Sequence, residues 1–189
     1  MDCADTPQML AGCLAGDEYA IERLIQTYQA GVFRLALSVL DDPLEANEAA
    51  QDTFIAALGA LGHYQDKSTF KAWLYTIALN VSRSRLRKRK TAERLKNTLQ
   101  ALFKVQAQKT PTAEDAVIQN EKEAAVWQAL ETLGEKHRLP VVLRYFHDLS
   151  TAEIAEIMQI SEGTVFSRLH TARERLRVEI KKQAGFSGD

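Results

Sequence analysis

Apolar residues recur every three or four positions along most of this chain, the spacing that gathers them on one side of an α-helix. The pattern covers residues 17–40, 44–61 and 70 to about 90, and it resumes over 117–133 and 139–146. Only 4 prolines and 9 glycines occur in 189 residues, so the breaks expected between short strands are missing. We therefore predict an all-α protein.

A polar interval divides this pattern into two small helical domains. Residues 91–116 begin as an amphipathic stretch and turn polar around Pro111, which predicts a linker that is helical only at its start. The N-terminal domain is then predicted over residues 1–90. The C-terminal domain is predicted over 117–183, with four helices.

Glycines and prolines predict where some of these helices begin, bend or end. Pro43 suits the first turn of the second helix, and Gly62 is expected to follow its end. Gly31 is expected to kink or break the first helix. Pro140 is expected to lie near the start of the helix predicted over 139–146.

The C-terminal domain ends in a helix-turn-helix pattern. Ser150 and Glu153 have the spacing of a capping box at the start of a short helix, and Ser161 is a candidate N-cap for the longer helix that follows. In this motif the second helix enters the DNA major groove, where its N-terminal residues meet base edges. An ordinary pair of packed helices gives the same pattern, so DNA binding is one of two interpretations at this point.

The net charge of −1 conceals a strong asymmetry along the chain. Residues 1–66 carry eleven acids and two bases, whereas residues 67–109 carry twelve bases and one acid. Six of the eight residues in the run RSRLRKRK, 83–90, are cationic. Such blocks indicate two different partners: nucleic-acid phosphates for the basic block and a protein for the acidic one.

Several classes of function are not supported by the sequence. No apolar run approaches the roughly 18 residues of a membrane span, and the acidic start MDCADTPQ is unlike a signal peptide, so a cytoplasmic location is expected. Cys3, Cys13 and the 4 histidines have neither metal-ligand nor catalytic spacing. We expect no cofactor, no metal site and no enzymatic activity.

Several segments together resemble one family, the extracytoplasmic-function sigma factors of bacterial RNA polymerase. DPLEANEAAQDTF (42–54) and FKAWLYTIALN (70–80), with the basic run after it, resemble sigma region 2. LPVVLRYFHDLSTAEIAEIMQISEGTVFSRLHTARERLR (139–177) is similar to sigma region 4. The resemblance implies a factor that binds core RNA polymerase and directs promoter-specific initiation of transcription.

The resemblance also implies a division of labour. Region 2 would bind the clamp coiled coil of the polymerase and melt the −10 promoter element, while region 4 would bind the polymerase flap and the −35 element. An anti-sigma factor is implied as a further partner. The polymerase-binding residues would be Glu45, Glu48, Gln51 and Asp52, all on the acidic helix.

Two sets of DNA-binding residues follow from the same resemblance. In the −10 set, a loop captures a flipped base by stacking and edge contacts, and cations after it hold phosphates. That set is Tyr64, Gln65, Asp66, Lys67, Ser68, Asn80, Arg83, Arg85, Arg87 and Lys88. The −35 set lies on the second helix of the helix-turn-helix and comprises Thr164, Phe166, Ser167, Arg168, His170, Thr171 and Arg173.

This chain departs from the family pattern by having fewer cations near the DNA. Phe166 and Thr171 are uncharged where the family usually has a cation, Ala56 replaces a usual lysine, and Thr76 and Leu79 replace usual arginines. The alternative is a helix-turn-helix repressor or activator with an N-terminal helical effector or dimerisation domain. Such proteins usually bind palindromes as dimers. Monomeric co-purification with core RNA polymerase would separate the two interpretations.

Overall fold

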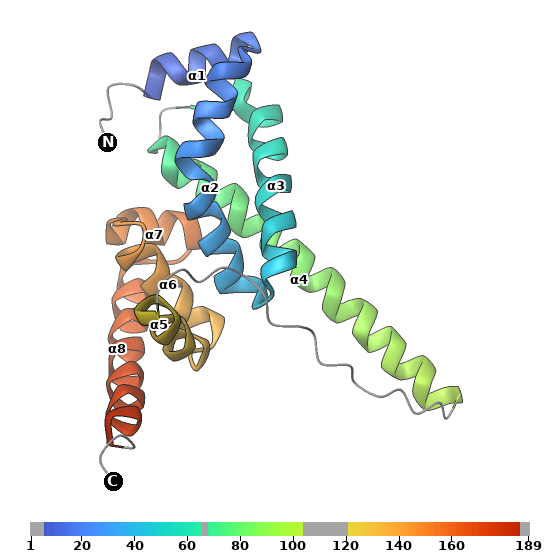
Figure 1. Ribbon diagram of the computed structural model, residues 1–189, viewed down its shortest axis with the longest axis vertical. Helices are drawn as coiled ribbons and strands as arrows, with labels where there is room; N and C mark the ends of the chain where they lie inside the picture. The colour runs from blue at the N-terminus through green and yellow to red at the C-terminus, as the bar shows by residue number, and fades with distance from the viewer. Residues whose placement is uncertain (1–5, 66–67, 104–120, 186–189) are drawn as a thin grey trace.

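The structure is a computed structural model that describes residues 6–65, 68–103 and 121–185. Within these ranges it is all-α, as predicted, and Figure 1 shows the helices in order. They are α1 (Thr6–Ala15), α2 (Glu18–Leu40), α3 (Pro43–Ala60), the 3₁₀ turn η2 (Leu61–His63), α4 (Phe70–Phe103), α5 (Glu121–Glu131), α6 (Glu135–Tyr145), α7 (Thr151–Met158) and α8 (Glu162–Gly185). The polar part of the predicted linker, residues 104–116, lies outside the described residues.

The cap residues explain where α2 and α3 begin and end. The Asp17 side chain accepts a hydrogen bond from the Tyr19 amide, and α2 ends at Asp41, whose left-handed φ of 54° turns the chain. Asp42 then accepts from the Glu45 amide, and Pro43 occupies the first turn of α3, as predicted. Helix α1 was not predicted from the pattern.

The expected break at Gly31 and the expected start of α6 near Pro140 were both wrong. α2 continues through Gly31 without a break. α6 begins at Glu135 rather than near Pro140, which lies inside the helix. Because proline has no N–H, Pro140 cannot form the helical hydrogen bond to the carbonyl four residues earlier, which is near the helix start. Burial of Pro140 with its neighbours offsets the loss of that one bond.

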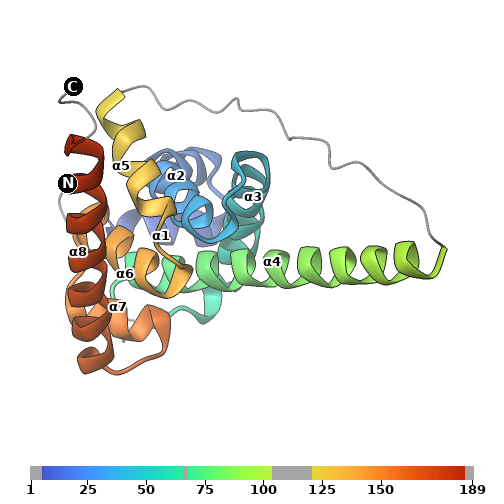
Figure 2. The ribbon, with the colours of Figure 1, turned by 90° about the horizontal axis from the view of Figure 1, so that it is seen from below.

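The helices pack as two groups that share one apolar core. In the first group α2, α3 and α4 pack around buried residues such as Leu24, Leu35 and Leu74; in the second, α5–α8 pack around residues such as Leu143 and Ile154. The groups meet where α6 contacts α2 and α7 contacts α4, so the apolar cluster runs through both. Figure 2 shows that the C-terminal part of α4 projects away from both groups.

Candidate nucleic-acid interfaces

Two caps fix the geometry of the helix-turn-helix. The Ser150 hydroxyl accepts from the Glu153 amide at 3.2 Å, and the Ser150 amide donates to the Glu153 carboxylate at 2.8 Å, so the predicted capping box is confirmed. Burial raises the pKa of Glu153, but hydrogen bonds from Ser150 outweigh it, and the net pKa is lowered. At the next helix, the Thr164 amide donates to the Ser161 hydroxyl at 3.2 Å, which confirms that N-cap.

Helix α8 has one buried side and one side open to solvent. Val165, Leu169 and Ala172 are buried against the other helices of the group. The predicted −35 residues lie elsewhere on the helix: Phe166, Ser167, His170 and Arg173 are exposed, while Thr164, Arg168 and Thr171 are half-buried. The structure therefore brings the whole −35 set together along one helix, with its N-terminal half accessible.

A tyrosine that sequence reasoning missed contacts this set. The Arg173 guanidinium donates from Nε and Nη2 to the Tyr145 hydroxyl at 3.0 and 2.8 Å, and it lies over the Tyr145 ring. Tyr145 is 53 % exposed at the end of α6. Its 28-residue separation from Arg173 left no local signal that could have predicted the contact.

The loop before α4 is held by aromatic packing. The Tyr64 ring packs edge-on against Phe70 at 5.6 Å and at a tilt against Trp73 at 5.2 Å between centroids, and its hydroxyl donates to the Ser68 carbonyl at 2.8 Å. Gln65 is exposed. Asp66 and Lys67 lie outside the described residues. Tyr64 therefore shapes the loop from inside it, whereas Gln65 faces solvent.

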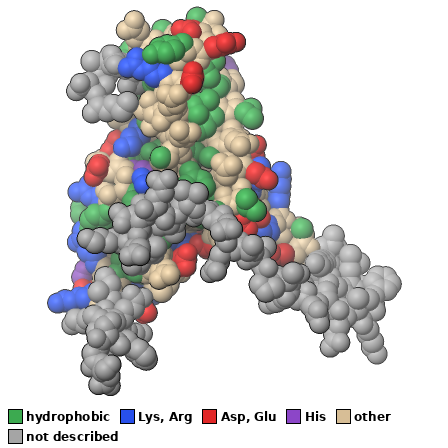
Figure 3. Space-filling model, in the orientation of Figure 1, with side chains coloured by type: hydrophobic (Ala, Val, Ile, Leu, Met, Phe, Trp, Pro, Cys, Tyr) green, Lys and Arg blue, Asp and Glu red, His purple; other side chains and the backbone are tan. Residues whose placement is uncertain are grey.

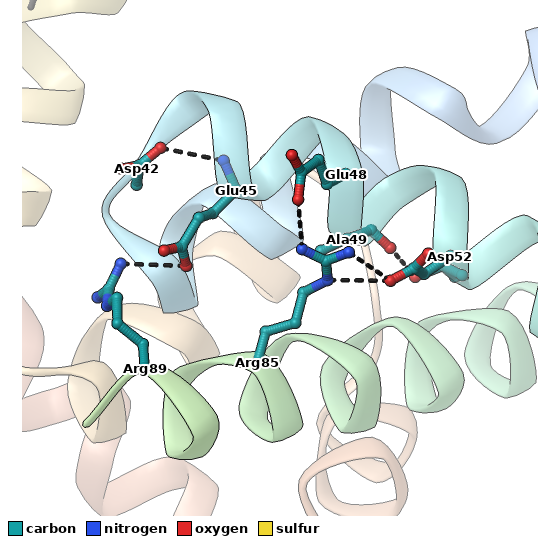
Figure 4. Close-up of polar contacts among 8 residues, drawn as sticks. Asp42, Glu45, Glu48, Ala49, Asp52, Arg85 and Arg89 are labelled. Atoms are coloured by element: carbon teal, nitrogen blue, oxygen red, sulfur yellow. Dashed lines mark hydrogen bonds and ion pairs between the residues drawn. The ribbon is translucent and has the colours of Figure 1, made fainter. Parts of the chain in front are cut away.

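The basic run and the acidic helix are paired with each other (Figure 4). Arg85 donates from Nη1 to Glu48 at 2.7 Å and from Nη2 to Asp52 at 2.6 Å. These hydrogen bonds, that to Asp52 first, raise the pKa of Arg85. Arg89 pairs with Glu45 at 3.1 Å. Acids and bases that form separate blocks in the sequence thus alternate in space, and Figure 3 shows both signs interspersed over one face.

The remaining members of the −10 set differ in accessibility. Asn80, Arg87 and Lys88 are exposed on α4. Arg83 instead pairs with Glu135 of α6 at 3.0 Å. Of the cations predicted to hold phosphates, Arg87 and Lys88 therefore present their charges to solvent. Arg83 and Arg85 instead form ion pairs with carboxylates of the same chain.

Helix α3 also presents apolar side chains that the sequence analysis passed over. Leu44 is 75 % and Ile55 is 71 % exposed. Their spacing from Glu48 and Gln51, at i, i+4, i+7 and i+11, places all four on one side of the helix. We call this set the α3 strip. The sequence did contain a sign of this strip, because Leu44 and Ile55 do not fall at the helical spacing of the buried residues of α3.

The two helix groups are joined by polar contacts as well as by the core. Arg138 of α6, buried at 4 % exposure, donates from Nε to the Ser38 carbonyl at 2.8 Å and pairs with Asp41 at 2.6 Å. Lys71 donates to the His147 carbonyl, and Thr69 donates to Glu153 at 3.0 Å. We call these contacts, with Arg83–Glu135, the inter-group contact.

Comparison with known proteins assigns both groups. The family model for Sigma-70 region 2 matches residues 24–92, and the model for Sigma-70, region 4 matches residues 123–176. The chain is 32 % identical over 171 residues to the ECF RNA polymerase sigma factor SigW of Bacillus subtilis, covering 88 % of this chain and 91 % of the relative. It is 34 % identical over 174 residues to the RNA polymerase sigma-H factor of Pseudomonas aeruginosa, covering 89 % and 90 %.

The chain belongs to the extracytoplasmic-function sigma factors. The predicted family is confirmed, and the sigma factor is a DNA-binding initiation factor that works with core RNA polymerase, not an enzyme. The matches to both regions set aside the repressor or activator alternative. Along the described ranges, no helix of this sigma factor is long and apolar enough to cross a membrane.

Solved structures show the same fold for this sigma factor. CnrH in complex with the cytosolic domain of CnrY aligns with a TM-score of 0.65 at 24 % identity, over 92 % of this chain and 96 % of that one. The sigma factor RpoE in complex with the anti-sigma factor NepR, from Bartonella quintana, aligns with a TM-score of 0.64 at 24 % identity, over 85 % and 96 %.

Proposed function

We propose that the sigma factor reads the −35 element with the N-terminal half of α8 and melts the −10 element with the loop before α4 and the exposed part of α4. The observation that carries this proposal is the doubly capped helix-turn-helix, which presents Phe166, Ser167 and His170 to solvent. Base-edge contacts come from the N-terminal residues of such a helix. Arg173, held by Tyr145, would then contact backbone phosphate.

The −10 function is divided among residues with different surroundings. Arg87 and Lys88 are exposed and would contact phosphates, whereas Arg85 couples α4 to α3. Gln65 would meet the flipped base. Tyr64 would hold the loop in shape through its packing on Phe70 and its bond to the Ser68 carbonyl, rather than offer a free stacking face.

The α3 strip is the surface that we propose for the polymerase clamp. Its exposed apolar residues, Leu44 and Ile55, lie at the two ends of the strip with the polar Glu48 and Gln51 between them, so the strip offers a partner both apolar area and hydrogen-bonding groups. Asp52 lies beside the strip, while Glu45 faces Arg89 and is the least accessible of the four predicted polymerase contacts.

Three further assignments remain proposals. We place the region 2-like domain at residues 1–90, the linker at 91–116 and the region 4-like domain at 117–183. The factor would act in the cytoplasm, where core polymerase and promoter DNA are found. An anti-sigma factor would regulate it, a proposal supported by the relatives of the same fold whose structures hold CnrY or the anti-sigma factor NepR.

Run-off transcription tests the proposed function directly. The full chain is added to core RNA polymerase on a promoter library, and each transcript start is mapped. We expect starts at a shared pair of elements and none with core polymerase alone. Transcripts that start at the same sites without the protein, or none with it, would contradict the proposal.

The polymerase surface is tested by a matched pair of variants. Leu44→Ala with Ile55→Ala removes the apolar ends of the α3 strip and is expected to weaken core binding about tenfold, because both side chains would be buried at the interface. Leu14→Ala removes an exposed leucine of α1 and should leave core affinity unchanged. Equal affinities of the two variants would place the clamp surface elsewhere.

A further inference from the structure

The N-terminal half of α8 presents to solvent one large side chain that can make no hydrogen bond. Phe166 is 62 % exposed, and Ser167 and His170 on the same open side of the helix are exposed as well. In the proposed function the −35 element is read from this side, so an apolar ring of this size would lie where the helix meets base edges. A phenylalanine contributes nothing to phosphate attraction, so the contact that it can offer DNA is an apolar one.

The hydroxyl groups around Phe166 are already engaged by the helix itself. Ser167 donates to the Thr164 carbonyl at 3.0 Å, and Thr171 donates to the Ser167 carbonyl at 2.9 Å. The Thr164 hydroxyl bonds to that of the N-cap Ser161 at 2.9 Å. Ser167 and Thr171 therefore have no hydroxyl hydrogen to spare for a base in this conformation, and Phe166 offers a larger contact surface than either.

Only one group in the major groove matches an apolar ring. Each base pair presents hydrogen-bond donors and acceptors there, but the thymine 5-methyl is the single apolar group. We propose that Phe166 is a specificity-determining residue that selects thymine at one position of the −35 element by packing against its 5-methyl group. This inference rests on the proposed −35 function of α8, and it names what one residue of that surface reads.

The test removes the methyl group without changing any hydrogen bond. Holoenzyme is assembled from the full chain and core polymerase and bound to a promoter that run-off transcription has selected. Each thymine of the −35 element, on either strand, is replaced singly by deoxyuridine. Binding is measured by competition for the parent protein and for Phe166→Ala, Phe166→Leu and Val178→Ala.

We expect one thymine at which deoxyuridine weakens the parent about fourfold, the loss of burying one methyl-sized group. Phe166→Ala should bind the two DNAs alike, and Phe166→Leu should keep part of the difference because it retains an apolar surface. Val178→Ala changes an exposed apolar residue farther along α8, at 53 % exposure, and should keep the full difference. Circular dichroism of each variant checks that the helical content of the protein is unchanged.

Three results would overturn this inference while leaving the proposed function intact. In the first, the parent binds equally well when any −35 thymine is replaced by deoxyuridine. In the second, Phe166→Ala loses as much affinity as the parent on that replacement. In the third, the selected −35 element contains no A·T pair. Failure of the parent holoenzyme to bind any promoter would overturn the proposed function itself. The two failures are therefore distinguishable in one series of measurements.

Discussion

Two sets of ion pairs hold this molecule together, and they differ mainly in their access to water. Within region 2, Arg85 joins α4 to α3, with its side chain 27 % exposed and its partners Glu48 and Asp52 at 64 % and 48 %. Between the regions, Arg138 is 4 % exposed and bonds to Asp41 and to the Ser38 carbonyl. Asp41 itself is 56 % exposed, so the two pairings differ in the burial of the guanidinium, and solvent screens the second pairing less than the first.

This difference has a functional consequence. An exposed pair is worth little on its own, so Arg85 can exchange its carboxylates for other anions at small cost. A guanidinium as buried as that of Arg138 is costly to leave without its counter-charge. The α3–α4 surface is therefore adaptable, while the inter-group contact fixes the arrangement of the two regions, and the following predictions test that contrast.

The largest effect is expected from removing the counter-charge of Arg138. Asp41→Asn keeps a residue that tolerates the left-handed φ of 54° at the end of α2 but leaves the buried guanidinium without a carboxylate. Unfolding free energy should fall by about 3 kcal/mol, the low end for a buried pair, because the Asp41 carboxylate is 56 % exposed. Urea denaturation measures it, and small-angle scattering reports whether the two regions separate before they unfold.

The adjacent residue provides the control for that variant. Asp42→Asn removes the same charge at the N-cap of α3, where asparagine caps as well as aspartate, and should change stability by less than about 0.5 kcal/mol. Equal losses from Asp41→Asn and Asp42→Asn would mean that Arg138 draws its stability from the Ser38 carbonyl and not from the ion pair.

The inter-group contact should also weaken in acid because of His147. Burial, with the charges of Lys71 and Arg34, lowers the pKa of His147 from 6.5 to about 4. Tyr75, the other titratable group facing it, has its pKa raised by burial and stays neutral in this range. Between pH 6.5 and 4 the unfolded chain binds a proton that the folded chain does not, so stability falls as the pH is lowered.

The expected loss across that window is about 3 kcal/mol. Urea denaturation at several pH values, for the parent and for His147→Gln, isolates this residue from carboxylates such as Glu153 that also respond to acid. The difference in slope between the two proteins is the predicted quantity. Parallel stability profiles would show that His147 takes up a proton in the folded state as readily as in the unfolded one.

A smaller loss is expected where α2 approaches the inter-group contact. A Cβ on Gly31 would collide with the Tyr75 hydroxyl and lie 3.4 Å from the His147 ring. Overpacking should exceed the gain in helix propensity, so Gly31→Ala is expected to cost about 1–2 kcal/mol in thermal or urea unfolding. In a Tyr75→Phe background, which lacks the hydroxyl, the same substitution should cost less.

Gly59 offers the matched control for Gly31. It lies in α3, and a Cβ there would meet nothing within 4 Å. Gly59→Ala should therefore be neutral or stabilise by up to about 1 kcal/mol. If both substitutions stabilise the protein, Tyr75 moves aside and Gly31 is not needed for the close approach of the helices.

The smallest effect is expected at the exposed pair. A double-mutant cycle of Arg85→Gln and Asp52→Asn should give a coupling energy below about 1 kcal/mol, falling further as salt is raised. The same cycle for the Arg138–Asp41 pair should exceed it severalfold and respond less to salt. A larger coupling at Arg85 than at Arg138 would reverse the comparison drawn above.

The sequence alone determined most of the helices and the caps of the helix-turn-helix. Helical periodicity predicted α2, α3 and the start of α4, and the capping box of Ser150 and Glu153 with the N-cap Ser161 located the helix-turn-helix to the residue. Such signals are local: each depends on side chains within one or two turns of the same segment, and so they can be read without knowledge of the fold.

Only the tertiary structure decided which charges remain available. The basic run suggested four cations for DNA, yet Arg83 and Arg85 face carboxylates of α6 and α3, 52 and as many as 37 residues away. Arg138 is likewise buried against Asp41, 97 residues earlier in the chain. Charge is a property of a residue, but its partner depends on which helices pack together, and packing follows from burial of the shared apolar core rather than from any local pattern.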